Sequence, residues 1–131
     1  YAERHQLLYN PDNLNHCRLL HDRQAWGYDS DTDEWCSWAR QAGISLDGCQ
    51  SSMGFDRSDL AIIAAINHAG VAMGRKNLVR QRLERNELVE PFPGKAVRCN
   101  QRYYMATLPH RQCPKIQAFI EWISAQAKEI D

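Results

Sequence analysis

Short apolar runs alternate with amphipathic stretches along most of the chain. The apolar runs lie between turn-forming residues, which is typical of buried strands. The amphipathic stretches repeat apolar residues at spacings of three and four, which is typical of helices. The predicted strands are residues 17–21, 50–55, 70–74 and 97–108, and the predicted helices are residues 31–42, 57–68, 76–85 and 114–128. This alternation predicts an α/β fold with a largely parallel sheet.

Two of the predicted helices carry start signals. Asp31 is expected to cap the first helix, with Glu34 completing a capping box three residues later and Gly43 ending the helix. Asp56 is expected to cap the second helix, which is apolar on nearly all sides and so should pack against more than one neighbour.

Composition and charge exclude several classes of function. The 131 residues fit one domain, and 16 basic residues balance 16 acidic ones, which argues against direct binding of DNA or RNA by this chain. The basic helix at residues 75–85 therefore has two interpretations, a DNA patch or, as the ordinary one, a solvated helix face. No apolar run approaches the roughly 18 residues of a membrane span, and no signal peptide is recognisable. We therefore expect a cytoplasmic protein.

The residues that carry chemistry do not suggest an enzyme. The five cysteines are widely spaced and contain no Cys-x-x-Cys pair, so reduced thiols are expected and no metal site. A phosphate loop and a Ser/His/Asp arrangement are also missing from the sequence, so we expect no cofactor and no catalytic residue. A small α/β hydrolase is the alternative from another functional class. The start at Tyr1, without an initiator methionine, indicates a fragment of a longer protein.

A series of motifs, in order, resembles the effector-binding domain of LysR-type transcription regulators. The series runs through an apolar helix, a Gly-Val-Ala strand, a basic helix, a Leu-Val-x-Pro-Phe segment, a tyrosine-rich strand and a final Ala-Phe-x-x-Trp helix. Its residues are 59–66, 69–72, Leu83, 87–92, Tyr103, Tyr104, Leu108, Pro109 and 115–122.

The resemblance implies a periplasmic-binding-protein-like (type 2) effector domain with two lobes around a cleft. Residues 1–112 would form the second lobe, incomplete at its start, and residues 113–131 a C-terminal helix that returns to the first lobe. The resemblance further implies a homodimer or homotetramer that contacts DNA only through an N-terminal helix-turn-helix outside this chain, with no membrane partner.

Three runs, residues 19–26, 54–61 and 70–76, resemble a LysR subgroup that activates D-serine breakdown. This implies a small-molecule effector, an amino acid, with D-serine as the leading candidate. A regulator that senses another amino acid or a small organic acid is the alternative within the family.

Candidate ligand contacts follow the predicted strands. Asp22 can hold an ammonium group and Trp26 can close one wall of the cleft. A carboxylate suits the start of the helix after residue 55, where Arg57 and Ser58 can bind it. The candidate ligand-binding residues are Asp22, Trp26, Phe55, Asp56, Arg57, Ser58, Met73 and Gly74.

Each candidate also has an ordinary structural interpretation. The residues around Asp22 can be a strand end with solvated charges, Asp56 and Arg57 a plain helix cap, and Gly74 a tight turn. Trp35 and Trp38 are predicted to share one helix face, which can be either core or a dimer interface.

Overall fold

The structure, a computed structural model, describes residues 1–24, 33–47, 51–98, 104–108 and 113–128. The chain divides into two compact units, Tyr1–Arg98 and Cys99–Asp131. No helix in the described ranges is long and apolar enough to span a bilayer.

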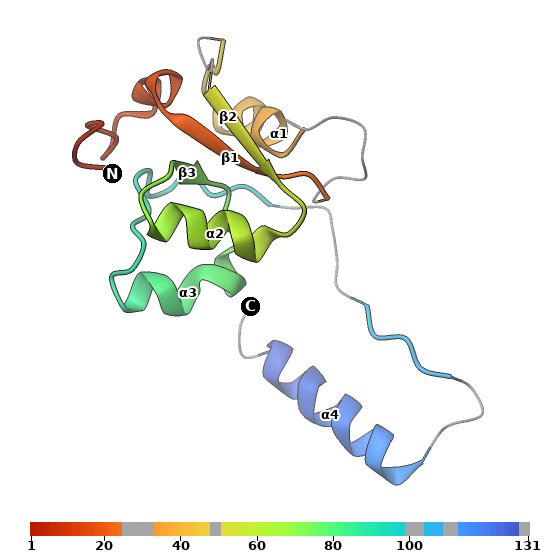
Figure 1. Ribbon diagram of the computed structural model, residues 1–131. Helices are drawn as coiled ribbons and strands as arrows, with labels where there is room; N and C mark the ends of the chain where they lie inside the picture. Colours follow the sequence, from red (N-terminus) through yellow and green to blue (C-terminus); the bar gives the residue numbers. More distant parts are fainter. Residues whose placement is uncertain (25–32, 48–50, 99–103, 109–112, 129–131) are drawn as a thin grey trace. The chain divides into compact units, whose positions relative to one another are not determined.

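The first unit is built on a parallel sheet of three strands (Figure 1). The strands are β1 (Arg18–Asp22), β2 (Ser51–Phe55) and β3 (Val71–Ala72), in the order β2-β1-β3. Both pairings are parallel, with Asp22 opposite Phe55 and Leu20 opposite Ala72. The predicted α/β fold with a parallel sheet is confirmed, although β3 is shorter than the predicted 70–74.

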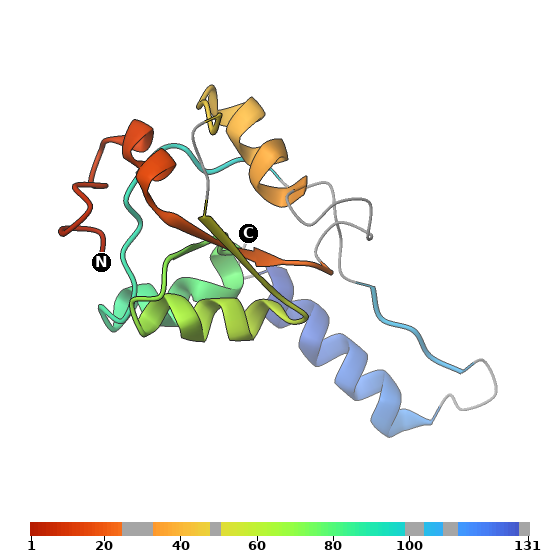
Figure 2. The ribbon, with the colours of Figure 1, turned by 45° about the horizontal axis from the view of Figure 1, so that its top comes forward.

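Helices cover both faces of this sheet. Helix α1 (Asp33–Ala42) lies on one face and α2 (Ser58–Ile66) on the other, with α3 (Lys76–Glu84) beside α2 (Figures 1 and 2). In the sheet, β2 lies on one side of β1 and β3 on the other. The connection from β1 to β2 contains α1 and the connection from β2 to β3 contains α2, and the two run in opposite directions across the sheet. Because such connections are right-handed, the two helices lie on opposite faces. Gly43 ends α1 as predicted, with a φ of 68° that favours glycine.

The main core lies between α1, β1 and two irregular segments. The turn-rich N-terminal segment with the short helix η1 (Pro11–His16) covers it from one end, and the Leu-Val-Glu-Pro-Phe segment crosses it. Its buried residues are Leu7, Leu14, Cys17, Leu19, Trp35, Trp38, Ala39 and Phe92.

Two tryptophans of α1 hold this core together. Trp35 and Trp38 are only 3% and 9% exposed, and their rings meet edge to face with centroids 5.7 Å apart. Each indole Nε1 donates to a backbone carbonyl, Trp35 to Leu20 O at 3.0 Å and Trp38 to Lys95 O at 2.9 Å. Both rings are therefore part of the core of this chain, and the predicted dimer interface at these residues stays a prediction.

Two predicted caps differ from the structure. Helix α2 begins at Ser58, so Arg57 occupies the cap position and Asp56 lies one residue before it. Glu34, expected in a capping box of α1, instead directs its carboxylate to the backbone of β1. Asp31 lies outside the described residues.

The second unit contains helix α4 (Pro114–Lys128), whose bounds match the prediction. Residues 97–98 and 104–108 form no strand, so the predicted strand 97–108 is wrong over its described parts. A strand needs a neighbour to accept its N–H groups, and none of the described strands pairs with these residues. Phe119 and Trp122 of α4 remain 55% and 57% exposed, with ring centroids 5.8 Å apart.

We predict that Trp35→Ala lowers the free energy of unfolding by about 3–5 kcal/mol, because it removes a large buried ring and leaves Leu20 O without its donor. Urea unfolding of the full chain followed by circular dichroism measures this. Leu78→Ala, at an exposed position of α3, is the control and should change stability by less than about 0.5 kcal/mol. Equal losses in the two variants would contradict the assigned core.

Candidate functional site: the carboxyl edge of the sheet

The three parallel strands end at the same edge, which brings several predicted site residues together. Asp22 ends β1 directly opposite Phe55, the last residue of β2. The ladder continues beyond them, because Arg23 N donates to Phe55 O at 2.9 Å. Residues 56–58 follow β2, and Met73 and Gly74 follow β3. In open α/β sheets this carboxyl edge is where ligands bind.

Asp22 is half-buried and points away from α1. Leu19 packs with Trp35 in the α1-side core, and alternation along the strand turns Leu20 and Asp22 to the opposite face, which α2 covers. One carboxylate oxygen, Oδ1, accepts the N–H of Gln24 at 3.0 Å. The side chain is thus held in a turn at the strand end, on the same face as the start of α2.

The start of α2 carries an exposed ion pair. The guanidinium of Arg57 donates to both carboxylate oxygens of Asp59, with Nε 2.9 Å from Oδ1. This bond raises the pKa of Arg57 and lowers the pKa of Asp59. A ligand carboxylate would have to share or displace Asp59. Ser58 is the first residue of the helix, and the backbone N–H groups of the next two residues, Asp59 and Leu60, bond the Asp59 carboxylate.

Glu34 belongs to this edge, although the sequence analysis did not identify it as a site residue. It is only 5% exposed, and its Oε1 accepts the backbone N–H of Asp22 at 2.9 Å. Burial raises the pKa of Glu34 to about 7, and the negative charge of Asp22 adds to the rise. The Asp22 N–H bond and the positive charge of Arg75 act in the opposite direction. The sequence pattern instead indicated a capping box with Asp31, three residues earlier, and gave no sign of the contact between Glu34 and Asp22.

Other predicted residues have different roles or locations. Met73 is half-buried and packs against the core cluster, and its predicted ligand contact stays a prediction. A Cβ at position 74 would lie 3.0 Å from Val79, so Gly74 allows α3 to pack closely. Asp56 is exposed and Phe55 is half-buried. Trp26 lies outside the described residues.

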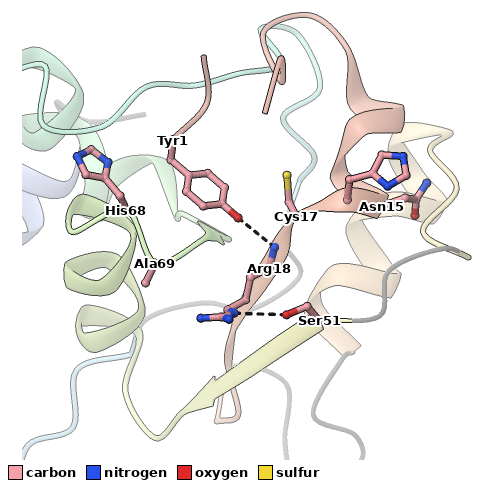
Figure 3. Close-up of a pocket in the computed structure, with 8 residues that line it drawn as sticks. Tyr1, Asn15, Cys17, Arg18, Ser51, His68 and Ala69 are labelled. Carbon is pink, nitrogen blue, oxygen red and sulfur yellow. Dashed lines mark hydrogen bonds between the residues drawn. The ribbon is translucent and has the colours of Figure 1, made fainter. Parts of the chain in front are cut away.

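A hollow of about 720 Å³ opens at the other edge of the sheet, where the strands begin (Figure 3). Tyr1, Arg18, Ser51 and His68 line it, with Arg18 N donating to the Tyr1 hydroxyl at 3.1 Å and Arg18 Nε to Ser51 Oγ at 3.3 Å. Residues 68–69 follow the carboxyl end of α2, whose dipole disfavours an anion. A carboxylate ligand is therefore expected at the carboxyl edge and not in this hollow.

A parallel α/β layer with charges of both signs at its strand ends is the architecture of a small-molecule-binding domain. The chain belongs to the LysR substrate binding domain family, whose profile matches residues 1–128. This family has the periplasmic-binding-protein-like fold.

Two relatives give the level of similarity. The chain is 59% identical over 128 residues to the HTH-type transcriptional regulator DsdC of Escherichia coli strain K12, covering 98% of this chain and 41% of the relative. It is 30% identical over 120 residues to the glycine cleavage system transcriptional activator of the same strain, covering 92% of this chain and 37% of the relative. The chain thus spans about two fifths of the length of these relatives. No solved structure matches it.

We predict that Glu34 makes folding more favourable at acidic pH. Its pKa rises from 4.5 in the unfolded chain to about 7 in the folded one, so the folded state holds the proton more tightly. This contribution is fully present below about pH 4.5 and is lost as pH rises to about 7, a change of roughly 3 kcal/mol.

Urea unfolding of the wild-type chain and of Glu34→Gln at pH 5 and pH 8 tests this sign. The free energy of unfolding of Glu34→Gln minus that of the wild type should be more positive at pH 8 than at pH 5. The control Glu84→Gln, at an exposed position, should show the same pH dependence as the wild type. The same pH dependence in Glu34→Gln and the wild type would refute the assignment.

Proposed function

We propose that this chain is the inducer-binding part of a LysR-type transcription activator, forming most of the second lobe of its effector domain. The observation that carries the proposal is the carboxyl edge, where Asp22 and the start of α2 lie at adjacent, paired strand ends. The family membership supports the same function. The complete regulator would act in the cytoplasm and would contact DNA through a helix-turn-helix outside this chain.

The proposed effector is D-serine, and the function would be control of D-serine catabolism. A zwitterion requires both signs of charge close together, and the edge supplies Asp22 for the ammonium group and Arg57 for the carboxylate. Ser58, the first residue of α2, would complete the carboxylate and hydroxyl contacts. The resemblance of residues 19–26, 54–61 and 70–76 to activators of D-serine breakdown selects D-serine among amino acids.

The opposite wall of the cleft would come from a first lobe outside residues 1–131. The exposed apolar side chains Phe119 and Trp122 of α4 support a packing partner for this helix, and the first lobe is the proposed one. An effector that favours one arrangement of the lobes would then shift the geometry of a homodimer or homotetramer and so its DNA contacts.

A chimeric regulator tests this function. In it, residues 1–131 replace the segment of E. coli DsdC that they match. We expect calorimetry to show D-serine binding and a DNA-linked reporter to respond to D-serine but not to L-serine. Indifference to both enantiomers, or an equal response to both, would contradict the proposal.

Within the same chimera, Arg57→Ala should weaken D-serine binding by tenfold or more, because a charged hydrogen bond of about 1.5–3 kcal/mol is lost. Arg80→Ala is the matched control: Arg80 forms an exposed pair with Glu84 on α3, away from the strand ends. Wild-type affinity in Arg57→Ala would remove this residue from the site.

The isolated chain should bind D-serine weakly or not at all, because it supplies one wall of the cleft only. A dissociation constant in the low micromolar range, measured by calorimetry on the 131-residue chain, would contradict the two-lobe account.

A further inference from the structure

A buried acid lies against the residue that should hold the effector's ammonium group. Glu34, in the first turn of α1, is 5% exposed, and its Oε1 is 2.9 Å from the backbone nitrogen of Asp22. Acidic side chains are rarely buried to this degree unless they are paired or have a specific role. The position of Glu34 therefore needs an explanation beyond helix capping.

The position of Glu34 is fixed from both sides. The next residue, Trp35, is anchored in the core and donates to Leu20 O at 3.0 Å. Glu34 accepts from Asp22, two residues further along the same strand. The two bonds fasten the start of α1 to the end of β1, and the Glu34 carboxylate cannot leave the strand end without losing its bond to Asp22.

Charges of both signs act on Glu34 from the described residues. Asp22 of β1 contributes a second negative charge, and Arg75, before α3, contributes a positive one. The net result is a carboxyl group that holds its proton up to about pH 7. A cation at the strand end, within range of both negative charges, would favour the ionised form of Glu34.

We propose that Glu34 is a second anionic residue of the effector site and that, together with Asp22, it receives the ammonium group of an amino-acid effector. The proposal rests on the proposed function, and it adds the residue that selects amino acids over hydroxy acids. It also makes effector binding sensitive to pH, since an ammonium group favours the charged form of Glu34 and binding releases its proton.

The direction of this dependence follows from linkage. An amino-acid ammonium group stays charged throughout pH 6–8, while Glu34 changes from mostly protonated to mostly ionised. If the effector binds the ionised form, affinity should rise about tenfold from pH 6 to pH 8 and level off above. A variant at position 34 shows whether Glu34 is the group responsible for this pH dependence.

The test is calorimetry with D-serine at pH 6, 7 and 8, on the DsdC chimera that contains the full chain. The parent and Glu84→Gln should gain about tenfold in affinity over this range. Glu34→Gln should lose this gain and bind about tenfold more weakly than the parent at pH 8. D-glycerate, which has a hydroxyl in place of the ammonium, should bind weakly and without this pH dependence.

The outcomes separate the two proposals. If the parent chimera binds no D-serine at any pH, the proposed function fails and this inference fails with it. If the parent binds D-serine and Glu34→Gln keeps both its affinity and its pH profile, Glu34 is structural only and the function stands. Thermal unfolding of each variant at each pH shows whether a loss of binding reflects a loss of fold, and an unfolded Glu34→Gln is replaced by Glu34→Asp, which should retain the pH dependence.

Discussion

The register in which β1 pairs with β2 is the constraint on which the site depends. It sets Asp22 opposite Phe55, and the chain then needs only two more residues to reach the cap of α2. A shift of one residue would turn Asp22 to the α1 face and Leu19 away from the core. The register is held by burial, because Leu19 and Leu20 are both buried and each packs on its own face of the sheet. Packing of apolar side chains therefore decides where the charged ones lie.

The face of the sheet covered by α1 carries the packed aromatic core, and the face covered by α2 carries the candidate ligand contacts. The rings of His21, Trp35, Trp38 and Phe92 form a continuous series of contacts that connects β1 with the segment after α3. The hydrogen bonds from the two indoles to Leu20 O and Lys95 O fix the orientation of the tryptophan rings. On this fixed base, Glu34 reaches across to the strand end, and the buried acid is tolerated because Trp35 beside it holds the helix start in place.

The periodic parts of the fold could be predicted from the sequence, and the contacts between elements could not. Repeats of apolar residues located β1, α1, α2 and α4 within a residue or two, because burial imposes those spacings. The carboxyl edge also followed, since parallel strands end together. The cap of α2 moved from Asp56 to Arg57 because a capping pattern does not determine the first helical residue. The spacing assigned Glu34 to a local helix cap, whereas its carboxylate accepts the backbone N–H of Asp22 in β1. The strand predicted at 97–108 would have needed a neighbouring strand, and the pattern of apolar residues within one segment does not show whether such a neighbour exists.

The most direct measurement for the account is a crystal structure of the DsdC chimera grown with D-serine. We expect the amino acid at the carboxyl edge, with its ammonium group on Asp22 and its carboxylate at Arg57 and the start of α2. Density for the ligand in the hollow beside Tyr1 and Arg18, or at a place that touches neither Asp22 nor Arg57, would contradict it.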